Sequence, residues 1–346
     1  MSNNSNKSTS PLLHSKKHAL NSKLKTVMSA AALSLVCTLS ACTQNTSKTA
    51  KASTSTPSVS TDSNSVLFAR HVPERSDDFA WENDLVAFRA YGPALRQGAE
   101  NAGTDCWLKR VNYPIINKWY QQALEQGLSY HQDHGEGLDN YHVGASLGCG
   151  ASALWLKGKA EPLETWTHWS DLQIGQQQLS FVLHYQREIN GKLYQEQKTI
   201  SLRPGVRLFR VQSQFLIDGK PASNLALVTG LSTHYGKAEV KIGKDNNWLA
   251  TWEELDGSGL GTGIVLGKNN SSEKPKAKAL TQALTSDVND PQALLLSQTD
   301  EHGRFEYFAG YGWQKAEQIT NKEQWLNYLK QFSETNPYYP DSSTSD

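Results

Sequence analysis

Residues 130–142 are the part of the sequence richest in side chains that transfer protons or hold a ligand. They include three histidines, three carboxylates and two tyrosines, namely Tyr130, His131, Asp133, His134, Glu136, Asp139, Tyr141 and His142. Glycines at 135, 137 and 144 allow backbone conformations closed to other residues, so polar side chains can point to one place without a regular element. Because active sites are often built on such loops, the segment predicts a catalytic or binding loop.

These residue types suit removal of a proton next to a carboxylate, followed by loss of an oxygen from the neighbouring carbon. That reaction needs a base, an acid for the departing oxygen, and positive charge on the carboxylate. An imidazole titrates near neutral pH, so His131 and His134 are the candidate bases. Tyr130 and Tyr141 are the candidate proton donors, and His234, which follows an apolar run elsewhere in the chain, is a further candidate imidazole.

The candidate substrate-binding residues are two cations and three tryptophans: Arg89, Lys109, Trp107, Trp119 and Trp252. A guanidinium matches a carboxylate with two hydrogen bonds, so the two cations are predicted to clamp a substrate carboxylate. Sugar rings stack on aromatic faces, which makes the tryptophans candidate subsites. The alternatives are structural: Arg89 pairs internally with Glu82 or Asp84, because a buried unpaired charge is costly, and the tryptophans fill the core.

The spacing of His131 and His134 also suits a divalent metal, with Asp133 or Glu136 nearby as an oxygen ligand for zinc or calcium. A third protein ligand cannot be located from the sequence, so the metal stays an alternative and no other cofactor is predicted. In a simpler alternative, the two histidines only form hydrogen bonds that stabilise the loop. Asp133 and Glu136 also form a carboxylate pair of the kind that glycoside hydrolases use.

Short runs of alternating or β-rich sequence predict the elements that position this loop. They cover residues 79–91, 179–187, 193–202, 206–217, 225–231, 248–252, 263–266, 293–297 and 305–313. Turn sequences at Asn190-Gly191 and Pro204-Gly205 predict short hairpin connections. Helical patterning is limited to 114–125 and to 321–332, where an Asn/Thr cap precedes an apolar face. We expect a mainly antiparallel β fold of two stacked curved sheets with a few peripheral helices.

The N-terminal segment predicts export and lipid anchoring. Lysines precede an apolar run that ends in small residues before Cys42, which is typical of a bacterial lipoprotein signal; an ordinary signal peptide is the alternative. Residues 1–41 are then a signal peptide, 42–64 a flexible Ser/Thr-rich tether, and 65–346 a single β-sandwich domain. We expect a periplasmic or outer-membrane-anchored lipoprotein of a Gram-negative bacterium, with lipid on Cys42 as its only membrane contact.

Charge and cysteine content limit the partners. Loss of five leader lysines leaves 29 basic residues against 34 acidic ones, and no basic stripe of the kind that nucleic acid requires is present. Apart from Cys42 and a cysteine in the leader, the chain has only Cys106 and Cys149. In an oxidising compartment they form a disulfide or remain two buried thiols, and the sequence leaves both open.

Two resemblances sharpen these expectations. The hairpin over 181–215, with Leu202-Arg203-Pro204-Gly205-Val206-Arg207-Leu208, resembles galactose-mutarotase-like supersandwich proteins. An ordered series of motifs resembles domain-of-unknown-function family 4861, whose members come from polysaccharide-utilising bacteria. The motifs are Pro73-Glu74-Arg75, Asp78 to Asp84, Ala87 to Pro93, Asp105 to Arg110, Lys118 to Tyr120 and Tyr130 to Gly144. The resemblance implies a carbohydrate-active periplasmic protein, and one relative resembles an oligosaccharide dehydratase acting on ulvan.

Residue types and resemblance together predict a carbon–oxygen lyase. Its reaction is a β-elimination on an anionic, uronic-acid-containing oligosaccharide such as an ulvan or pectin fragment, by dehydratase or polysaccharide lyase chemistry. The alternatives are a non-catalytic lipoprotein that binds oligosaccharides through its aromatic residues, a glycoside hydrolase that uses Asp133 and Glu136, and a mutarotase-like epimerase.

Overall fold

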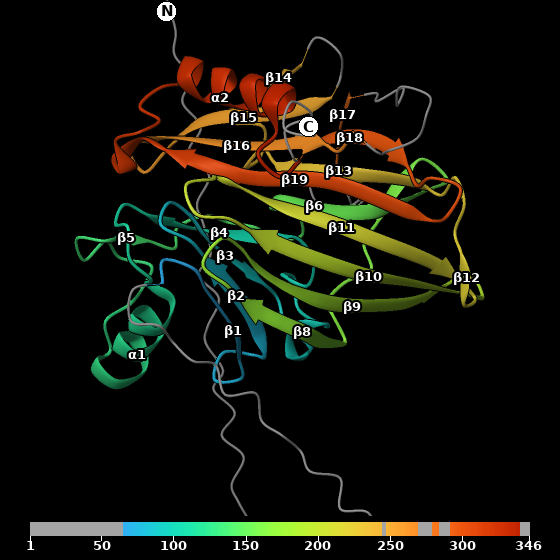
Figure 1. Cartoon of the computed structure of the whole chain (residues 1–346), viewed down its shortest axis with the longest axis horizontal. Coiled ribbons are helices and arrows are strands. Elements are labelled where there is room, and N and C mark those ends of the chain that lie inside the picture. The colour runs from blue at the N-terminus through green and yellow to red at the C-terminus, as the bar shows by residue number, and fades with distance from the viewer. Residues whose placement is uncertain (1–64, 244–246, 269–278, 284–290, 340–346) are drawn as a thin grey trace, which may run out of the picture. The chain divides into compact units, whose positions relative to one another are not determined.

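The computed structural model describes residues 65–243, 247–268, 279–283 and 291–339. The predicted signal segment, Cys42 and the tether lie outside these described residues. Within them, no helix combines the length and apolar character that crossing a bilayer requires. Strands arranged in antiparallel sheets dominate, with two α-helices (Figure 1), which confirms the predicted mainly β sandwich.

The first sheet has five strands in the order β1-β2-β3-β4-β5. They are β1 (Phe68–Val72), β2 (Asp78–Glu82), β3 (Ala87–Ala90), β4 (Thr104–Lys109) and β5 (Gly137–Leu138). β2 and β3 replace the single run predicted over 79–91, because Asn83 turns the chain: its side-chain oxygen accepts from the N–H of Leu85 at 2.8 Å and of Val86 at 2.9 Å. The 3-10 helix η1 (Pro93–Leu95) follows β3.

Helix α1 (Ile116–Gln126) packs on the first sheet through Ile116, Trp119 and Tyr120, which share one face of the helix. The sequence predicted this helix over 114–125. Its first turn is capped from outside the helix, since the Glu82 carboxylate accepts hydrogen bonds from the N–H groups of Ile115 and Ile116, each at 2.9 Å.

The largest sheet has nine strands in the order β14-β15-β16-β19-β11-β10-β9-β8, with β12 beside β11. They are β8 (His168–Ile174), β9 (Leu179–Ile189), β10 (Lys192–Leu202), β11 (Leu208–Ile217), β12 (Lys220–Pro221), β14 (Glu239–Ile242), β15 (Trp248–Leu255), β16 (Ser258–Leu266) and β19 (Arg304–Trp313). The predicted hairpin at Asn190-Gly191 is confirmed: both residues have positive φ, at 52° and 73°, as a tight β9–β10 turn requires.

The third sheet has the order β17-β18-β13-β6-β7. Its strands are β6 (Cys149–Leu156), β7 (Lys159–Glu161), β13 (Ala226–Ser232), β17 (Ala279–Ala283) and β18 (Pro291–Gln298). This sheet and the first sheet lie on the same face of the nine-stranded sheet. Ala309 and Tyr311 share that face of β19; a Cβ on Gly150 of β6 would lie 2.3 Å from Ala309, and Phe88 of β3 lies 5.5 Å from Tyr311 between ring centroids.

The opposite face of the nine-stranded sheet is covered at one end by helix α2 (Lys322–Thr335), which follows the 3-10 helix η2 (Gln314–Ala316) and lies over β15 and β16 (Figure 1). Close approach needs glycine on β16, because a Cβ on Gly261 would lie 2.3 Å from the Trp325 ring. The predicted cap is confirmed: the Asn321 side chain accepts from the Gln324 N–H at 3.0 Å.

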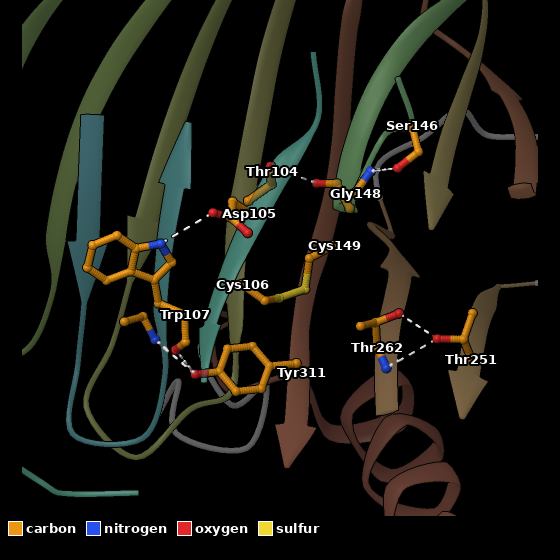
Figure 2. Close-up of a disulfide and its surroundings, with 12 residues drawn as sticks. Thr104, Asp105, Cys106, Trp107, Ser146, Gly148, Cys149, Thr251, Thr262 and Tyr311 are labelled. Atoms are coloured by element: carbon orange, nitrogen blue, oxygen red, sulfur yellow. Dashed lines mark hydrogen bonds between the residues drawn. A yellow bond between two sulfur atoms is a disulfide. The ribbon is translucent and has the colours of Figure 1, made fainter. Parts of the chain in front are cut away.

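A disulfide between Cys106 on β4 and Cys149 on β6 joins the first and third sheets (Figure 2). The two Cα atoms are 6.0 Å apart, and both residues are fully buried. Beside it, Thr104 and Gly148 form an isolated parallel bridge. Of the two states that the sequence left open for these cysteines, the structure has the disulfide.

Candidate functional site

The predicted catalytic segment forms a loop after α1, which we call the imidazole loop (residues 127–144). Gly127 ends α1 in the left-handed conformation, with φ of 68°, and its N–H bonds the Gln122 carbonyl. Gly137 pairs with Lys109 on the edge of β4 at φ of 126°, where a Cβ would lie 1.9 Å from the Leu108 carbonyl oxygen. Only glycine fits at residue 137, so this position fixes the loop on the first sheet.

The His131 ring is oriented by a backbone carbonyl. Its Nδ1 lies 2.7 Å from the carbonyl oxygen of Asp139, and because a carbonyl only accepts, Nδ1 carries the proton. In the neutral imidazole, Nε2 then keeps its lone pair. The side chain is 59% exposed, and Nε2 has no hydrogen-bond partner in the described part of the chain. A fixed tautomer with an exposed lone pair is the geometry of a general base.

His134 has the same arrangement with its nitrogens exchanged. Nε2 lies 3.0 Å from the Ser129 carbonyl oxygen and therefore carries the proton, which leaves the lone pair on Nδ1. The side chain is also exposed. Among the described residues no ring contact joins His134 to His131, so the two imidazoles are separate groups of the same loop.

Tyr130 lies between His131 and a guanidinium, that of Arg75. The ring centroids of Tyr130 and His131 are 4.6 Å apart, and the Tyr130 phenol lies close to the Arg75 side chain. That side chain is 26% exposed and also donates from Nη1 to Asp78 at 3.0 Å. An imidazole, a phenol and a partly exposed guanidinium are therefore neighbours, and we call Arg75, Tyr130 and His131 the candidate site.

Arg89 lies behind the candidate site, and the structure corrects its predicted role. The side chain is only 3% exposed, with Nη2 at 2.6 Å from Asp105 and 3.2 Å from Asp139, and Nε at 3.7 Å from Asp78. A buried guanidinium that pairs with three carboxyl groups cannot contact a substrate. The alternative of an internal ion pair is what the structure has, although neither Glu82 nor Asp84 is the partner.

Burial dominates the electrostatics of this cluster. It raises the pKa of Asp78 to about 6, although Arg89 and Arg75 both act to lower it. Burial also raises the pKa of Asp105, and raises that of Asp139 well above its ordinary value, with the Asp105 charge adding to the effect. Since three carboxyl groups share two guanidinium groups, we expect the cluster to hold a proton near neutral pH. The Asp139 carboxyl lies 3.7 Å from His131 Nδ1, which connects the cluster to the exposed imidazole.

Lys109 is likewise part of the fold, so its predicted substrate contact is corrected too. Its ammonium donates to the Glu82 carboxylate at 2.8 Å, to the Asn83 carbonyl at 2.8 Å and to the Tyr113 carbonyl at 2.7 Å, and the side chain is fully buried. All three N–H donors are thereby used. The ion pair holds the carboxylate of Glu82 at the start of α1.

Of the three tryptophans predicted as sugar subsites, two are sealed. Trp107 is 1% exposed and Trp119 is 5% exposed. Trp107 stacks between Trp119 and Tyr130, at ring-centroid distances of 5.5 and 5.0 Å. Its Nε1–H donates to Asp105 at 3.2 Å (Figure 2). Tyr130 is the half-buried outer ring of this stack. Trp252 is half-buried on β15, against the cluster under α2.

Tyr141 and His234 meet in a second cluster at the end of the imidazole loop. Their ring centroids are 4.7 Å apart, and His234 binds the Glu253 carboxylate through Nδ1 and the His142 carbonyl through Nε2 at 3.0 Å. Both ring nitrogens are engaged and the side chain is buried, so His234 holds the loop and offers no free lone pair. In the described part of the chain no hydrogen bond or ring contact links His234 to His131.

In the structure, the residues predicted for a metal site or a hydrolase carboxylate pair are engaged in other contacts. Among the described residues no three His, Cys, Asp or Glu side chains are grouped to hold a metal ion, and Asp133 instead pairs with Arg110 at 2.9 Å. Glu136 accepts from Lys118 at 2.6 Å and from Trp119 at 3.1 Å. Although burial acts to raise the pKa of Glu136, these donors outweigh it and the pKa is lowered, which disfavours a role as general acid.

The residue that the sequence analysis missed is Arg75. It stands in the quoted Pro73-Glu74-Arg75 motif, but more than fifty positions separate it from Tyr130, and no pattern along the chain shows that the two meet. Asp78 and Asp139, which complete the support behind the site, were likewise given no role. In the structure Arg75 and Asp78 lie on either side of a turn with two positive-φ residues, Ser76 and Asp77, which no glycine marks in the sequence.

Comparison with known proteins gives a family and one named relative. The profile described as "Domain of unknown function (DUF4861)" matches residues 21–336. "Uncharacterized protein P7" of Formosa agariphila is 35% identical over 286 residues, which cover 80% of this chain and 69% of that protein.

Solved structures match at low identity. A heparinase III gene product is 12% identical with a TM-score of 0.39, over 72% of this chain and 36% of that one. Heparan sulfate lyase HepC from Pedobacter heparinus is 10% identical with a TM-score of 0.39, over 70% and 36%. GH36 alpha-galactosidase AgaB from Geobacillus stearothermophilus is 6% identical with a TM-score of 0.32, over 71% and 41%. The chain spans well under half the length of these proteins, and likenesses this low identify neither substrate nor reaction.

Proposed function

Because the chain belongs to the DUF4861 family, whose description names no activity, we propose a function from the geometry of the candidate site: a carbohydrate-active lyase. Its reaction is a β-elimination on uronic-acid-containing oligosaccharides such as ulvan or pectin fragments, with water or a sugar as the leaving group. The observation that carries the proposal is the exposed His131 imidazole, whose tautomer the Asp139 carbonyl fixes, beside a phenol that lies close to a guanidinium.

Each step of the elimination has a side chain for it. The lone pair on His131 Nε2 takes the proton from the carbon next to the carboxylate, and the imidazole becomes an imidazolium. The Arg75 guanidinium stabilises the negative charge that develops on the carboxylate. As the bond from the neighbouring carbon to its oxygen breaks, the Tyr130 phenol gives a proton to that oxygen. The electron pair of the broken C–H bond becomes the new carbon–carbon double bond.

The groups behind the site support this cycle without touching substrate. The Asp139 carbonyl oxygen lies 2.7 Å from His131 Nδ1, so it accepts the Nδ1 proton both in the neutral ring and in the imidazolium formed during turnover. Arg89 fixes Asp139 from the buried side at 3.2 Å. Asp78 similarly orients Arg75 through the 3.0 Å hydrogen bond from Nη1. These three residues are positioning residues in the proposal.

The proposal includes the cellular setting predicted from the sequence. An anionic oligosaccharide is the partner, and the protein acts in the periplasm or at the outer membrane, held by lipid on Cys42. The tether over 42–64 then gives the domain reach from the lipid surface.

The reaction type is tested by product analysis. Elimination creates a double bond conjugated to the carboxylate, so ultraviolet absorbance rises when the protein meets ulvan, pectic or alginate oligosaccharides, and product mass shows loss of water or chain cleavage. Release of reducing ends without new absorbance would instead show hydrolysis. Binding with every oligosaccharide left unchanged would show the non-catalytic lipoprotein.

A further inference from the structure

The face of the nine-stranded sheet opposite the core carries a second polar surface, on strands that the candidate site does not use. It consists of Gln197 and Thr199 on β10, Gln212 and Gln214 on β11, and Arg304 and Glu306 on β19, which we call the amide face. The register aligns these residues in two rows across the sheet: Gln197 lies opposite Gln214 and then Arg304, and Thr199 lies opposite Gln212 and then Glu306. Residues directly opposite one another project from the same side of a sheet.

The amide face is hollowed. A cavity of about 320 Å³ lies over these side chains and extends to Asp300 in the turn before β19. The first row continues beyond Gln197 to His184 on β9 and His168 on β8. Those two imidazole rings stack with centroids 4.0 Å apart and planes within 8°. A polar row therefore crosses five strands, and the hollow lies at one end of it.

The charges of this surface are compensated within it. Arg304 Nε lies 2.8 Å from Asp300, and Glu306 accepts from Arg210 Nε at 2.7 Å. The amide face therefore attracts neither an anion nor a cation strongly. An acidic polysaccharide, a phosphate or a nucleic acid would need uncompensated positive charge, which the paired arginines do not supply.

What the amide face does offer is hydrogen-bonding capacity. Within the described residues the side chains of Gln197, Thr199 and Gln212 have no hydrogen-bond partner, and Gln214 uses its NH₂ group on the His302 carbonyl at 2.8 Å while its oxygen is not used. Side-chain amides and hydroxyls both donate and accept, and neighbouring strands place them roughly 4.8 Å apart. A polyhydroxylated chain matches such an array of donors and acceptors.

We propose that the amide face is a second carbohydrate-binding site, which takes a neutral stretch of a polysaccharide through its hydroxyl groups. The amide face contains no residue of the imidazole loop. This proposal therefore goes beyond the elimination reaction and can be tested independently of it. In a protein that acts on polymers, such a site would hold the chain of the substrate at the surface of the enzyme while the candidate site engages a uronate.

The test is calorimetric titration of the full chain with the neutral hexasaccharides of cellulose, xylan and mannan. The double variant Gln197→Ala/Gln212→Ala is expected to weaken the tightest of these interactions about tenfold or more, since two hydrogen bonds are lost. Thr199→Val, which keeps the side-chain shape, is expected to weaken it about threefold on the same grounds. The matched control Gln331→Ala changes an exposed glutamine on α2 and is expected to bind as the unaltered protein does.

The outcomes separate the two proposals. Weaker hexasaccharide binding in the double variant, with unchanged elimination of a short uronate oligosaccharide, supports the amide face as a separate site. Absence of binding by the unaltered protein to all three hexasaccharides at millimolar concentration overturns it, as does equal affinity of the double variant. If hexasaccharides bind at the amide face but no uronate oligosaccharide is eliminated, only the lyase proposal fails.

Discussion

Replacement of Arg89 by methionine is expected to destabilise the fold strongly, because the guanidinium is the common partner of three buried carboxyl groups. Asp105 and Asp139 lie 2.6 and 3.2 Å from Nη2, Asp78 lies 3.7 Å from Nε, and all four side chains are at most 3% exposed. Removing one partner from a buried ionic group costs about 3–5 kcal/mol. We expect the free energy of unfolding of Arg89→Met to fall by that amount near pH 8.

The size of this effect depends on pH in a direction that the structure determines. Without Arg89, the pKa values of Asp78, Asp105 and Asp139 rise further in the folded state, so the folded protein binds more protons than the unfolded chain over a wider range. Folding stability then falls more steeply as pH rises. The loss near pH 5 is therefore expected to be at least about 1 kcal/mol smaller than the loss near pH 8.

The assay is urea unfolding followed by fluorescence of the ten tryptophans, at both pH values. The control is Arg187→Met, which removes a cation that is 31% exposed and pairs with Glu164 at 3.2 Å, and it is expected to cost about 1 kcal/mol or less. An Arg89→Met loss no larger than that of the control, or one that is equal at both pH values, would refute the account of the buried cluster.

Three further predictions follow from the fold and the sequence. Burial raises the pKa of Asp78 from 3.8 to about 6, so the contribution of this carboxyl to stability is present below about pH 4 and is lost as pH rises through 6. Asp78→Asn is therefore expected to reduce the pH-dependent change in the free energy of unfolding across that window by about 3 kcal/mol. An unchanged pH dependence in parallel urea titrations would contradict this. Cys106→Ala/Cys149→Ala opens a crosslink between residues 43 positions apart and is expected to cost about 2–4 kcal/mol, checked by denaturation against the unaltered protein with and without reductant; equal stability would count against it. Cys42→Ser is expected to release the protein from the membrane fraction, and a variant that still sediments with membranes would disprove the lipid anchor.

The parts of the fold that could be predicted are those with local signals. Helix α2 was predicted over 321–332 because Trp325, Leu326, Leu329 and Phe332 repeat on one helical face behind a capping Asn321; the structure confirms the cap and the face, with Leu326 only partly buried, and the helix continues to Thr335. The β9–β10 hairpin was predicted by Asn190-Gly191, since few other pairs adopt two positive φ values. The turn between β2 and β3 was missed because the polar triplet Glu82-Asn83-Asp84, in which Asn83 makes the turn, was taken as part of one continuous strand.

The candidate site was predicted only as a loop. The density of imidazoles, phenols and carboxylates in 130–142 indicated where to look, but which groups are exposed depends on partners far away in the chain. In the sequence, Arg89 and Lys109 have the residue types of substrate clamps. In the fold, Arg89 pairs with Asp139, fifty positions away, and Lys109 pairs with Glu82, 27 positions away. Long-range pairing of this kind leaves no pattern in a single sequence, which is why Arg75 was missed and Trp107 was taken for a surface ring.

The central claim is that His131 is the base of an elimination reaction, and the direct measurement is turnover of uronate oligosaccharides by His131→Gln. Loss of a general base lowers the rate by about a hundredfold or more, whereas the exposed histidine variant His302→Gln is expected to keep full activity. Because His131 is 59% exposed, its replacement is also expected to leave the thermal unfolding midpoint unchanged. Undiminished double-bond formation by a folded His131→Gln protein would contradict the account.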